Sequence, residues 1–331
     1  MRYGNLALFL AGVLSFEARA FSETKISGPY AHDNLSIFLI HRSGDAEASA
    51  IRYLALQPAM ERKKVVVYET NQVNALAIEN LSSDPVFVQQ GDIVKGGNQD
   101  RMISNDFILP PKSGRLPLAA FCVEQGRWHP RGKEPAKTFS PPSEMAVLRF
   151  DPNKMWNQMS VWGTVSAIQE ALASRLQKHK GAGVAAVRPA VSPTSLVLTQ
   201  TSPPVEEAVG AYTRVLAGAV EGKTGVTGYA FAVNGEVKSA DVYASAALFS
   251  AMWPKLLKSS VVEALRMREQ GKAAPVKVSQ ILAFLREASS GKQTSIDVDR
   301  RVKLVKRESE RQLSVESREG TNWVHRSVVK K

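Results

Sequence analysis

Cysteine is almost missing from this sequence, because Cys122 is the only one among 331 residues. A single cysteine cannot form an intramolecular disulfide, so the fold must be held by packing and polar contacts even in an oxidising compartment. The small and apolar neighbours of Cys122 favour a buried thiol. Histidine is also scarce, and the five histidines are scattered without the spacing typical of metal ligands. We therefore expect no metal site and no cofactor.

Long apolar runs are missing as well. No uninterrupted run approaches the roughly 20 residues that a membrane-spanning helix needs. The chain is nevertheless 44% hydrophobic and 22% charged, with a mean hydropathy of −0.17. This composition excludes disordered, collagen-like and disulfide-scaffold classes, and the length is sufficient for one large or two ordinary domains.

The first twenty residues have the pattern of an export signal. Arg2 supplies the positive charge, residues 6–16 form a short apolar run, and Ala18 and Ala20 present small side chains before a cleavage site at Phe21. We predict a signal peptide over residues 1–20 and a periplasmic or secreted mature protein. No transmembrane span is expected after cleavage.

The positive charge is concentrated near the C-terminus. The whole chain has a formal net charge of +12, and residues 255–331 hold 18 Lys and Arg against 9 Asp and Glu. These charges alternate with Val, Leu and Ile instead of gathering around stacking aromatics, which is typical of solvated strand faces. The pattern disfavours nucleic acid as a partner and leaves an anionic surface or a protein partner open.

The apolar pattern predicts an α+β fold. Short apolar stretches separated by turn residues predict a β-rich domain over residues 21–150 that resembles a β-sandwich. Apolar residues at spacings of three and four then predict an amphipathic helix over 151–181. Residues 182–204 are rich in Pro and Ser and predict an exposed connection with one strand at 195–199. Residues 205–331 predict a mixed α/β region in which Pro254 interrupts a helix and the basic segments at the end form strands.

Two glycine-containing polar loops carry the candidate site, at residues 91–101 and 124–129. Arginines can hold a carboxylate or phosphate with two hydrogen bonds, paired glycines permit close backbone approach, and an aromatic ring can cover a base or sugar. If the loops meet, Asp100 and Glu124 are candidates for general acid and base. The alternative is that these pairs only fix the ends of hairpins. The predicted ligand-binding residues are Gly96, Gly97, Gln99, Arg101, Arg127 and Trp128.

Three sequence motifs resemble a known family. They are GDIVKGGNQDR at residues 91–101, CVEQGRW at 122–128 and FSAMWPKLL at 249–257. Together they are similar to the ARG and rhodanese-phosphatase-superfamily-associated protein family. The family name implies an association with ADP-ribosylglycohydrolase and rhodanese-phosphatase genes, and hence with ADP-ribose-like or phosphorylated ligands. The resemblance implies no particular reaction and no catalytic residue.

Two hypotheses about function follow. In the first, an exported α+β protein binds an anionic small molecule at the two loops, with hydrolysis of that ligand as a further step through Asp100 and Glu124. In the second, the protein is a non-catalytic interaction module of the cell envelope, and its basic C-terminal strands contact a protein partner. The sequence does not decide whether the protein is an enzyme.

Overall fold

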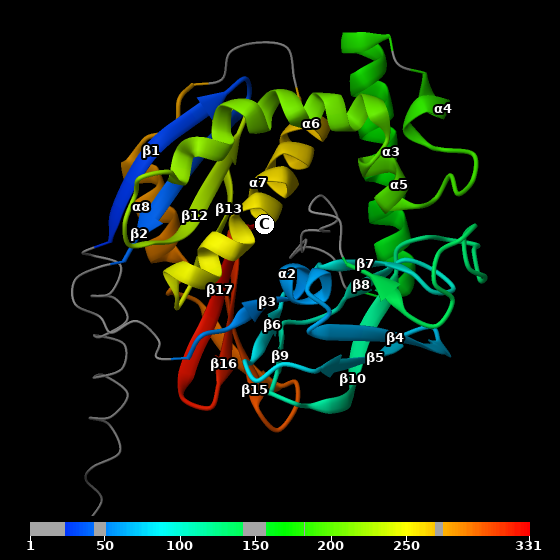
Figure 1. The fold of residues 1–331 in the computed structure, drawn as a ribbon. Coiled ribbons are helices and arrows are strands. Elements are labelled where there is room, and N and C mark those ends of the chain that lie inside the picture. Colours follow the sequence, from blue (N-terminus) through cyan, green and yellow to red (C-terminus); the bar gives the residue numbers. More distant parts are fainter. Residues whose placement is uncertain (1–23, 43–50, 142–156, 182, 269–273) are drawn as a thin grey trace, which may run out of the picture.

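The computed structural model describes residues 24–42, 51–141, 157–181, 183–268 and 274–331 (Figure 1). Its several sheets and helices confirm the predicted α+β class. The predicted signal peptide lies outside the described residues, as does the first part of the predicted helix at 151–156. No helix within the described ranges is both long and apolar enough to cross a membrane.

The largest sheet has eight strands, and every neighbouring pair in it is antiparallel. The order is β1-β2-β12-β13-β17-β16-β15-β14. The strands are β1 (Lys25–His32), β2 (Leu35–His41), β12 (Val226–Val233), β13 (Glu236–Tyr243), β14 (Lys292–Asp297), β15 (Val302–Glu308), β16 (Gln312–Glu319) and β17 (Asn322–Lys330). The large sheet therefore combines two strands from before residue 150, the end of the predicted β-rich domain, with six strands from after it.

Burial on both faces explains why β2 joins the C-terminal strands. Leu35, Ile37 and Leu39 face one core cluster, whereas Phe38 and Ile40 face another. A strand that is apolar on both faces is stable only inside a sheet that is covered on both sides. The following strand in the sheet, β12, is buried along its whole length, so the two strands form a covered pair inside the sheet, next to the edge strand β1.

Helices cover the two faces of this sheet. Helices α7 (Ala246–Arg266) and α6 (Pro203–Leu216) belong to the core on one face, together with α3 (Gln158–Lys180). Helix α8 (Val278–Glu287) buries Ile281, Phe284 and Leu285 against the other face. Figure 1 shows α7 running between the large sheet and the N-terminal strands. The molecule is thus layered around α7, which contacts both halves of the chain.

The remaining strands form two smaller sheets. The six-stranded sheet has the order β11-β7-β8-β10-β5-β4, and the three-stranded sheet has the order β3-β6-β9. Their apolar side chains form a separate core with the short helix α2 (Leu56–Glu61). The strands are β3 (Leu54–Ala55), β4 (Val65–Gln72), β5 (Ala75–Asn80), β6 (Val86–Val88), β7 (Ile93–Gly96), β8 (Arg101–Ile103), β9 (Phe107–Leu109), β10 (Gly114–Cys122) and β11 (Phe139–Ser140).

Helix α3 is fixed at both of its ends. Asn157 and Ser160 form a capping box at its start, and Gly181 ends it with a φ of 68° that favours glycine. The side chain of Gln158 exchanges two hydrogen bonds with the backbone of Cys122, at 2.9 and 2.7 Å. These bonds hold the end of β10, and the loop that follows it, against the first turn of the helix.

Two local predictions are wrong. Residues 196–200 form a short helix, α5 (Leu196–Gln200), instead of a strand, because the Ser195 side chain caps its first turn. Pro254 does not interrupt α7, which continues through it. Burial of this helix on several sides offsets the one backbone hydrogen bond that proline removes. The remaining helical pieces are α4 (Val184–Val187) and the 3-10 helix η1 (Ala217–Val220).

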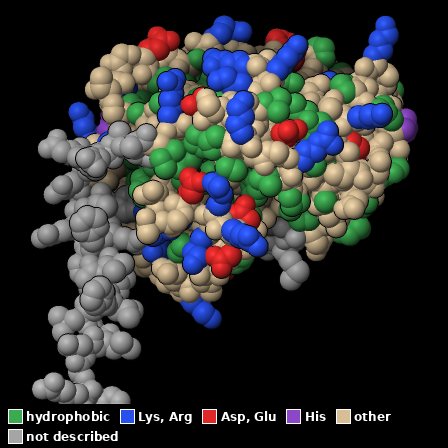
Figure 2. All heavy atoms as spheres, turned by 60° about the horizontal axis from the view of Figure 1, so that its bottom comes forward, with side chains coloured by type: hydrophobic (Ala, Val, Ile, Leu, Met, Phe, Trp, Pro, Cys, Tyr) green, Lys and Arg blue, Asp and Glu red, His purple; other side chains and the backbone are tan. Residues whose placement is uncertain are grey.

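Basic and acidic side chains are mixed on the lower face of the molecule (Figure 2). In Figure 2 the lower strands of Figure 1 come forward, and Lys or Arg side chains lie beside Asp or Glu side chains on that face. In the C-terminal strands, for example, Glu308 pairs with both Lys306 and Lys331. Such exposed pairs contribute little to stability, which agrees with a solvated strand face.

Candidate functional site

The two polar loops meet in space. The first loop connects β7 to β8, and the second follows β10, the neighbour of β8 in the sheet. The backbone N–H of Asp100 donates to Glu124 Oε2 at 3.1 Å. Gly97 lets the first loop pack against β4 and β11, because it has a φ of 53° and a Cβ there would lie 2.6 Å from both Glu69 Oε2 and the Phe139 ring.

Asp100 is completely buried, and both of its oxygens accept hydrogen bonds from the protein. Oδ1 accepts from the backbone N–H of Gly96 at 3.1 Å and from Arg131 Nη2 at 3.2 Å. Oδ2 accepts from Ser195 Oγ at 2.9 Å and from the same guanidinium at 3.3 Å. Arg127 adds a longer ion pair at 3.6 Å. Hydrogen-bond donors of the protein thus take the place of water around the Asp100 carboxylate.

Glu124 is held in the same way. Its Oε1 accepts from Arg131 Nη1 at 2.8 Å and from the Ser192 hydroxyl. Its Oε2 pairs with Arg127 Nη2 at 2.5 Å and accepts from the backbone of Asp100. We call the four charged side chains of Asp100, Glu124, Arg127 and Arg131 the loop cluster; all four are less than 10% exposed.

The environment moves the pKa values of the two carboxyls in opposite directions. Burial, together with the charge of Glu124, raises the pKa of Asp100 above its ordinary value. Burial acts in the same direction on Glu124, but hydrogen bonds from Arg127 and Ser192 outweigh it and lower the pKa of that carboxyl. The two groups are thus inequivalent, as in pairs that share acid and base roles. Geometry must decide whether a substrate can reach them.

Arg101 and Trp128 lie at the outer part of the same region. Arg101 is fully buried, donates to the Gln99 backbone oxygen at 3.3 Å and pairs with Glu69 at 3.6 Å. Its guanidinium carbon lies 5.3 Å from the centre of the Trp128 ring, a cation–π distance. That ring is 44% exposed, whereas Gln99 is buried. The indole therefore covers the arginine and leaves no direct path from solvent to it.

Several residues of this region were not predicted from the sequence. Arg131 pairs with the carboxylates of Asp100, Glu124 and Glu134. Ser192 and Ser195, which donate to these carboxylates, lie in the predicted connection at 182–204. Glu69, the partner of Arg101, lies in β4. The connection is thus partly buried, in contrast to the predicted exposure. The nearly uncharged composition of that segment is the one sequence signal that points to burial.

A second group of buried charged side chains lies where the N-terminal strands meet the large sheet and α7. Lys255 of α7 forms an ion pair with Asp92, and both are at most 4% exposed. Burial raises the pKa of Asp92, and the neighbouring ammonium opposes that effect without overcoming it. The Asp92 carboxylate also accepts from the backbone N–H of Gln89.

His325 of β17 lies between two aspartates in the same group. Its Nδ1 is 2.8 Å from Asp106 and its Nε2 is 3.2 Å from Asp241, so both ring nitrogens face a carboxylate. The Tyr243 ring stacks on the imidazole at 4.7 Å. Burial lowers the pKa of His325, but Asp106 and Asp241 outweigh it and raise the value to about 9. We call Asp92, Lys255, Asp106, Asp241 and His325 the interface cluster.

The arrangement defines an α+β protein whose N-terminal and C-terminal sheets are joined by buried ion pairs. The model of the ARG and Rhodanese-Phosphatase-superfamily-associated Protein domain matches residues 23–329, so the chain belongs to this family. The resemblance that the motifs indicated is confirmed. No curated protein and no solved structure matches the chain.

The three motifs that carried the resemblance contact one another. Asp92 of the first motif pairs with Lys255 of the third, and Asp100 of the first pairs with Arg127 of the second. Burial raises the pKa of the Cys122 thiol, which belongs to the second motif. Within the described ranges no group of three His, Cys, Asp or Glu side chains could hold a metal ion.

Proposed function

We propose that this protein is an exported, non-catalytic binding protein for an anionic small molecule, and that the loop cluster fixes its framework. One observation carries the non-catalytic part of the proposal. All four oxygens of Asp100 and Glu124 accept hydrogen bonds from protein donors, and both side chains have no exposed surface. A general acid or base must reach the proton that it transfers, directly or through one water.

The two arginines of the loop cluster are occupied by protein acceptors. Arg127 directs Nη1 to the backbone oxygens of Gly97 and His129, at 3.1 and 2.5 Å, and Nη2 to Glu124. The guanidinium of Arg131 forms ion pairs with three carboxylates, those of Asp100, Glu124 and Glu134. A guanidinium that binds phosphate bidentately needs two free N–H groups on one edge, and neither arginine offers them. The loops therefore support the fold better than they support ligand binding.

An anionic ligand agrees with the charge and with the family. The formal net charge of +12 favours the approach of anions to the protein. The name of the family points to ADP-ribose-like or phosphorylated molecules. Neither argument needs a catalytic group, so binding without turnover is the simplest function that fits the buried loops.

The test combines binding with turnover. Thermal unfolding of the purified protein is followed with ADP-ribose, nucleotides, sugar phosphates and neutral glycans, since a ligand of the native state raises the melting temperature. We expect an anionic compound to raise it and to be recovered unchanged by chromatography. Consumption of the compound by the wild-type protein, lost in a folded Glu124→Gln variant, would overturn the non-catalytic assignment.

Export is tested separately. The signal pattern of residues 1–20 supports processing before Phe21. We expect the cell-envelope or extracellular fraction to contain a protein whose N-terminal residue is Phe21. An unprocessed chain that starts at Met1 and stays with the cytosolic fraction would contradict export and leave the binding proposal intact.

A protein partner is the second candidate function, and one feature of the large sheet favours it. Strand β14 is an edge strand, all six of its residues are exposed, and Ile296 is 60% exposed. An exposed edge can pair with a strand of another chain. Under this alternative an Ile296→Lys substitution weakens capture of an envelope protein, and added salt weakens it further.

A further inference from the structure

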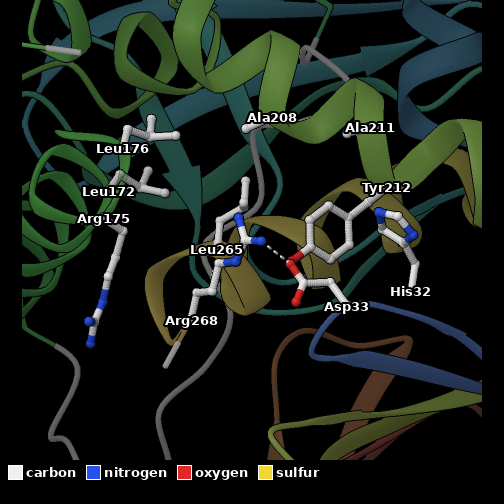
Figure 3. A pocket seen from close by; sticks show the side chains of 10 residues that line it. All are labelled: His32, Asp33, Leu172, Arg175, Leu176, Ala208, Ala211, Tyr212, Leu265 and Arg268. Atoms are coloured by element: carbon white, nitrogen blue, oxygen red, sulfur yellow. Dashed lines mark hydrogen bonds and ion pairs between the residues drawn. The ribbon is translucent and has the colours of Figure 1, made fainter. Parts of the chain in front are cut away.

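Two cavities in the described part of the chain are lined by arginines, and they differ in charge balance. The first, of about 100 Å³, is shown in Figure 3 and lies between α3, α6 and the turn after β1. The second, of about 200 Å³, lies between the α2 region and the first two turns of α7. Neither is lined by residues of the loop cluster or of the interface cluster.

The smaller cavity already holds a carboxylate, which pairs with one of its two arginines. Figure 3 shows Arg268 directed at Asp33, and their ion pair is 2.5 Å long. The Tyr212 hydroxyl also donates to Asp33, at 3.1 Å. Arg175 lies apart from this group in the same view. A ligand anion would compete here with a carboxylate that is already in place.

The larger cavity has no such carboxylate. Arg52, Arg62 and Lys64 line it, and no acidic side chain does. Within the described ranges neither arginine pairs with a carboxylate, and both are exposed. Lys64 has one partner, Asp84, at 3.7 Å, and both of these side chains are partly exposed. Two unpaired arginines and one lysine with a distant carboxylate partner thus line one opening, and this excess of positive charge favours an anionic occupant.

The walls of the larger cavity suit a compact ligand. Ala247 and Ala251, one turn apart on α7, leave room because their side chains are small. The Tyr53 ring is 5% exposed, and its hydroxyl is fixed by a 2.8 Å hydrogen bond to Glu319. A cavity of about 150 Å³ holds benzene, so about 200 Å³ accepts a group slightly larger than benzene. That size is too small for a whole dinucleotide, and it admits one part of a phosphorylated pentose while the rest faces solvent.

Helix α7 adds to the positive field. It begins at Ala246, so the backbone N–H of Ala247 has no acceptor within the helix. The positive end of the helix dipole therefore lies beside the three basic side chains. The helix end alone would not define a site, and here it reinforces charges that already line a cavity.

We propose that the cavity lined by Arg52, Arg62 and Lys64 binds the phosphate group of a compact phosphorylated sugar. This inference rests on the proposed binding function and gives that function a place and a ligand class. Arg52 and Arg62 reach the phosphate from the solvent side, Lys64 adds a point charge, and the wall of Tyr53, Ala247 and Ala251 contacts the sugar.

The test measures ribose 5-phosphate binding by calorimetry in the wild-type protein and in three variants. The Arg52→Gln/Arg62→Gln double variant removes two exposed charges, and Ala251→Trp fills the cavity while keeping every charge. Arg175→Gln is the matched control, because it removes an arginine from the other cavity. Circular dichroism and the melting temperature check that each variant is folded.

We expect both cavity variants to weaken binding at least tenfold, the control to bind like the wild type, and unphosphorylated ribose not to bind. Unchanged affinity in a folded double variant or in a folded Ala251→Trp would overturn the cavity as the site. Binding of ADP-ribose or another anion that is insensitive to these variants would leave the proposed function standing without this site. Absence of any anion binding to the wild type would overturn both.

Discussion

The loop cluster and the interface cluster are both buried groups of ion pairs, but they are built from different cations. The loop cluster neutralises Asp100 and Glu124 with two arginines. The interface cluster neutralises its aspartates with Lys255 and His325. Arginine stays charged at every accessible pH, whereas histidine titrates near neutrality. The cations of the loop cluster are thus permanent, whereas one cation of the interface cluster depends on protonation.

The clusters also differ in what they connect. The loop cluster joins segments within the first 200 residues, namely the two polar loops and the connection that bears Ser192 and Ser195. The interface cluster joins residues of β17 and α7 to the loops around Asp92 and Asp106. The first therefore shapes one part of the molecule, and the second holds the two parts together.

The largest expected effect comes from removing the shared cation of the loop cluster. An Arg131→Met substitution leaves Asp100, Glu124 and Glu134 without their common partner. Breaking a buried ion pair by removing one partner costs about 3–5 kcal/mol. Urea unfolding at pH 7 should show this loss as a lower midpoint with an unchanged slope. A loss below about 1 kcal/mol would mean that water reaches these carboxylates.

The interface cluster should respond to the loss of its lysine by a slightly smaller amount. Lys255→Met leaves the buried Asp92 carboxylate uncompensated, and we expect a loss of about 3 kcal/mol. Adding Asp92→Asn removes the uncompensated charge and keeps an acceptor for the Gln89 N–H. The double variant should recover most of the loss. A double variant as unstable as Lys255→Met would show that the loss does not come from the uncompensated charge of Asp92.

The pH dependence should separate the two clusters most clearly. The folded pKa of His325 is about 9, above the ordinary 6.5. A raised folded pKa contributes stability that is fully present below about pH 6.5 and is lost as the pH rises through about 9. The shift corresponds to about 3 kcal/mol. Asp106 and Asp241 face the ring. Burial raises the pKa of Asp106, but the neighbouring His325 outweighs it and lowers the value, and burial raises the pKa of Tyr243 well above its ordinary value.

Urea unfolding between pH 6 and pH 9.5 measures this loss, and His325→Gln is the variant to compare. The substitution lowers stability at pH 6 and should leave a nearly flat profile. The arginines of the loop cluster do not titrate in this range, so we expect them to add no change in the free energy of unfolding with pH. If the slope persists in His325→Gln, another group carries the pH dependence and the contrast between the clusters fails.

The sequence predicts the loop cluster better than the interface cluster, for a physical reason. Asp100, Arg101, Glu124 and Arg127 lie in loops that leave neighbouring strands, and a short separation along the chain favours contact between them. Asp92 and Lys255 lie 163 residues apart, and no local pattern indicates which helix meets which loop. The only sequence signal that links Asp92 and Lys255 is that each lies in a motif of the same family.

The pairing of β2 with β12 illustrates the same limit. Period-two alternation predicts that a segment is a strand, but it does not name the neighbouring strand. The apolar run at residues 37–40 indicates burial on both faces, which a two-sided sheet satisfies wherever its partner comes from. The serines at 192 and 195 were missed because hydroxyls in a Pro-rich segment are typical of exposed turns.

The smallest predicted effect tests whether the connection at 182–204 depends on the loop cluster. Ser195 donates to Asp100 at 2.9 Å and accepts from the Leu198 N–H at 3.2 Å, so Ser195→Ala should cost about 1–2 kcal/mol. Ser202→Ala is the matched control, because its buried hydroxyl donates only to the Thr199 backbone oxygen. Combining Ser195→Ala with Asp100→Asn gives a double-mutant cycle, and coupling above about 0.5 kcal/mol would tie the two together. Strict additivity would mean that Ser195 acts only as the cap of α5, and that the connection keeps its position without the carboxylate.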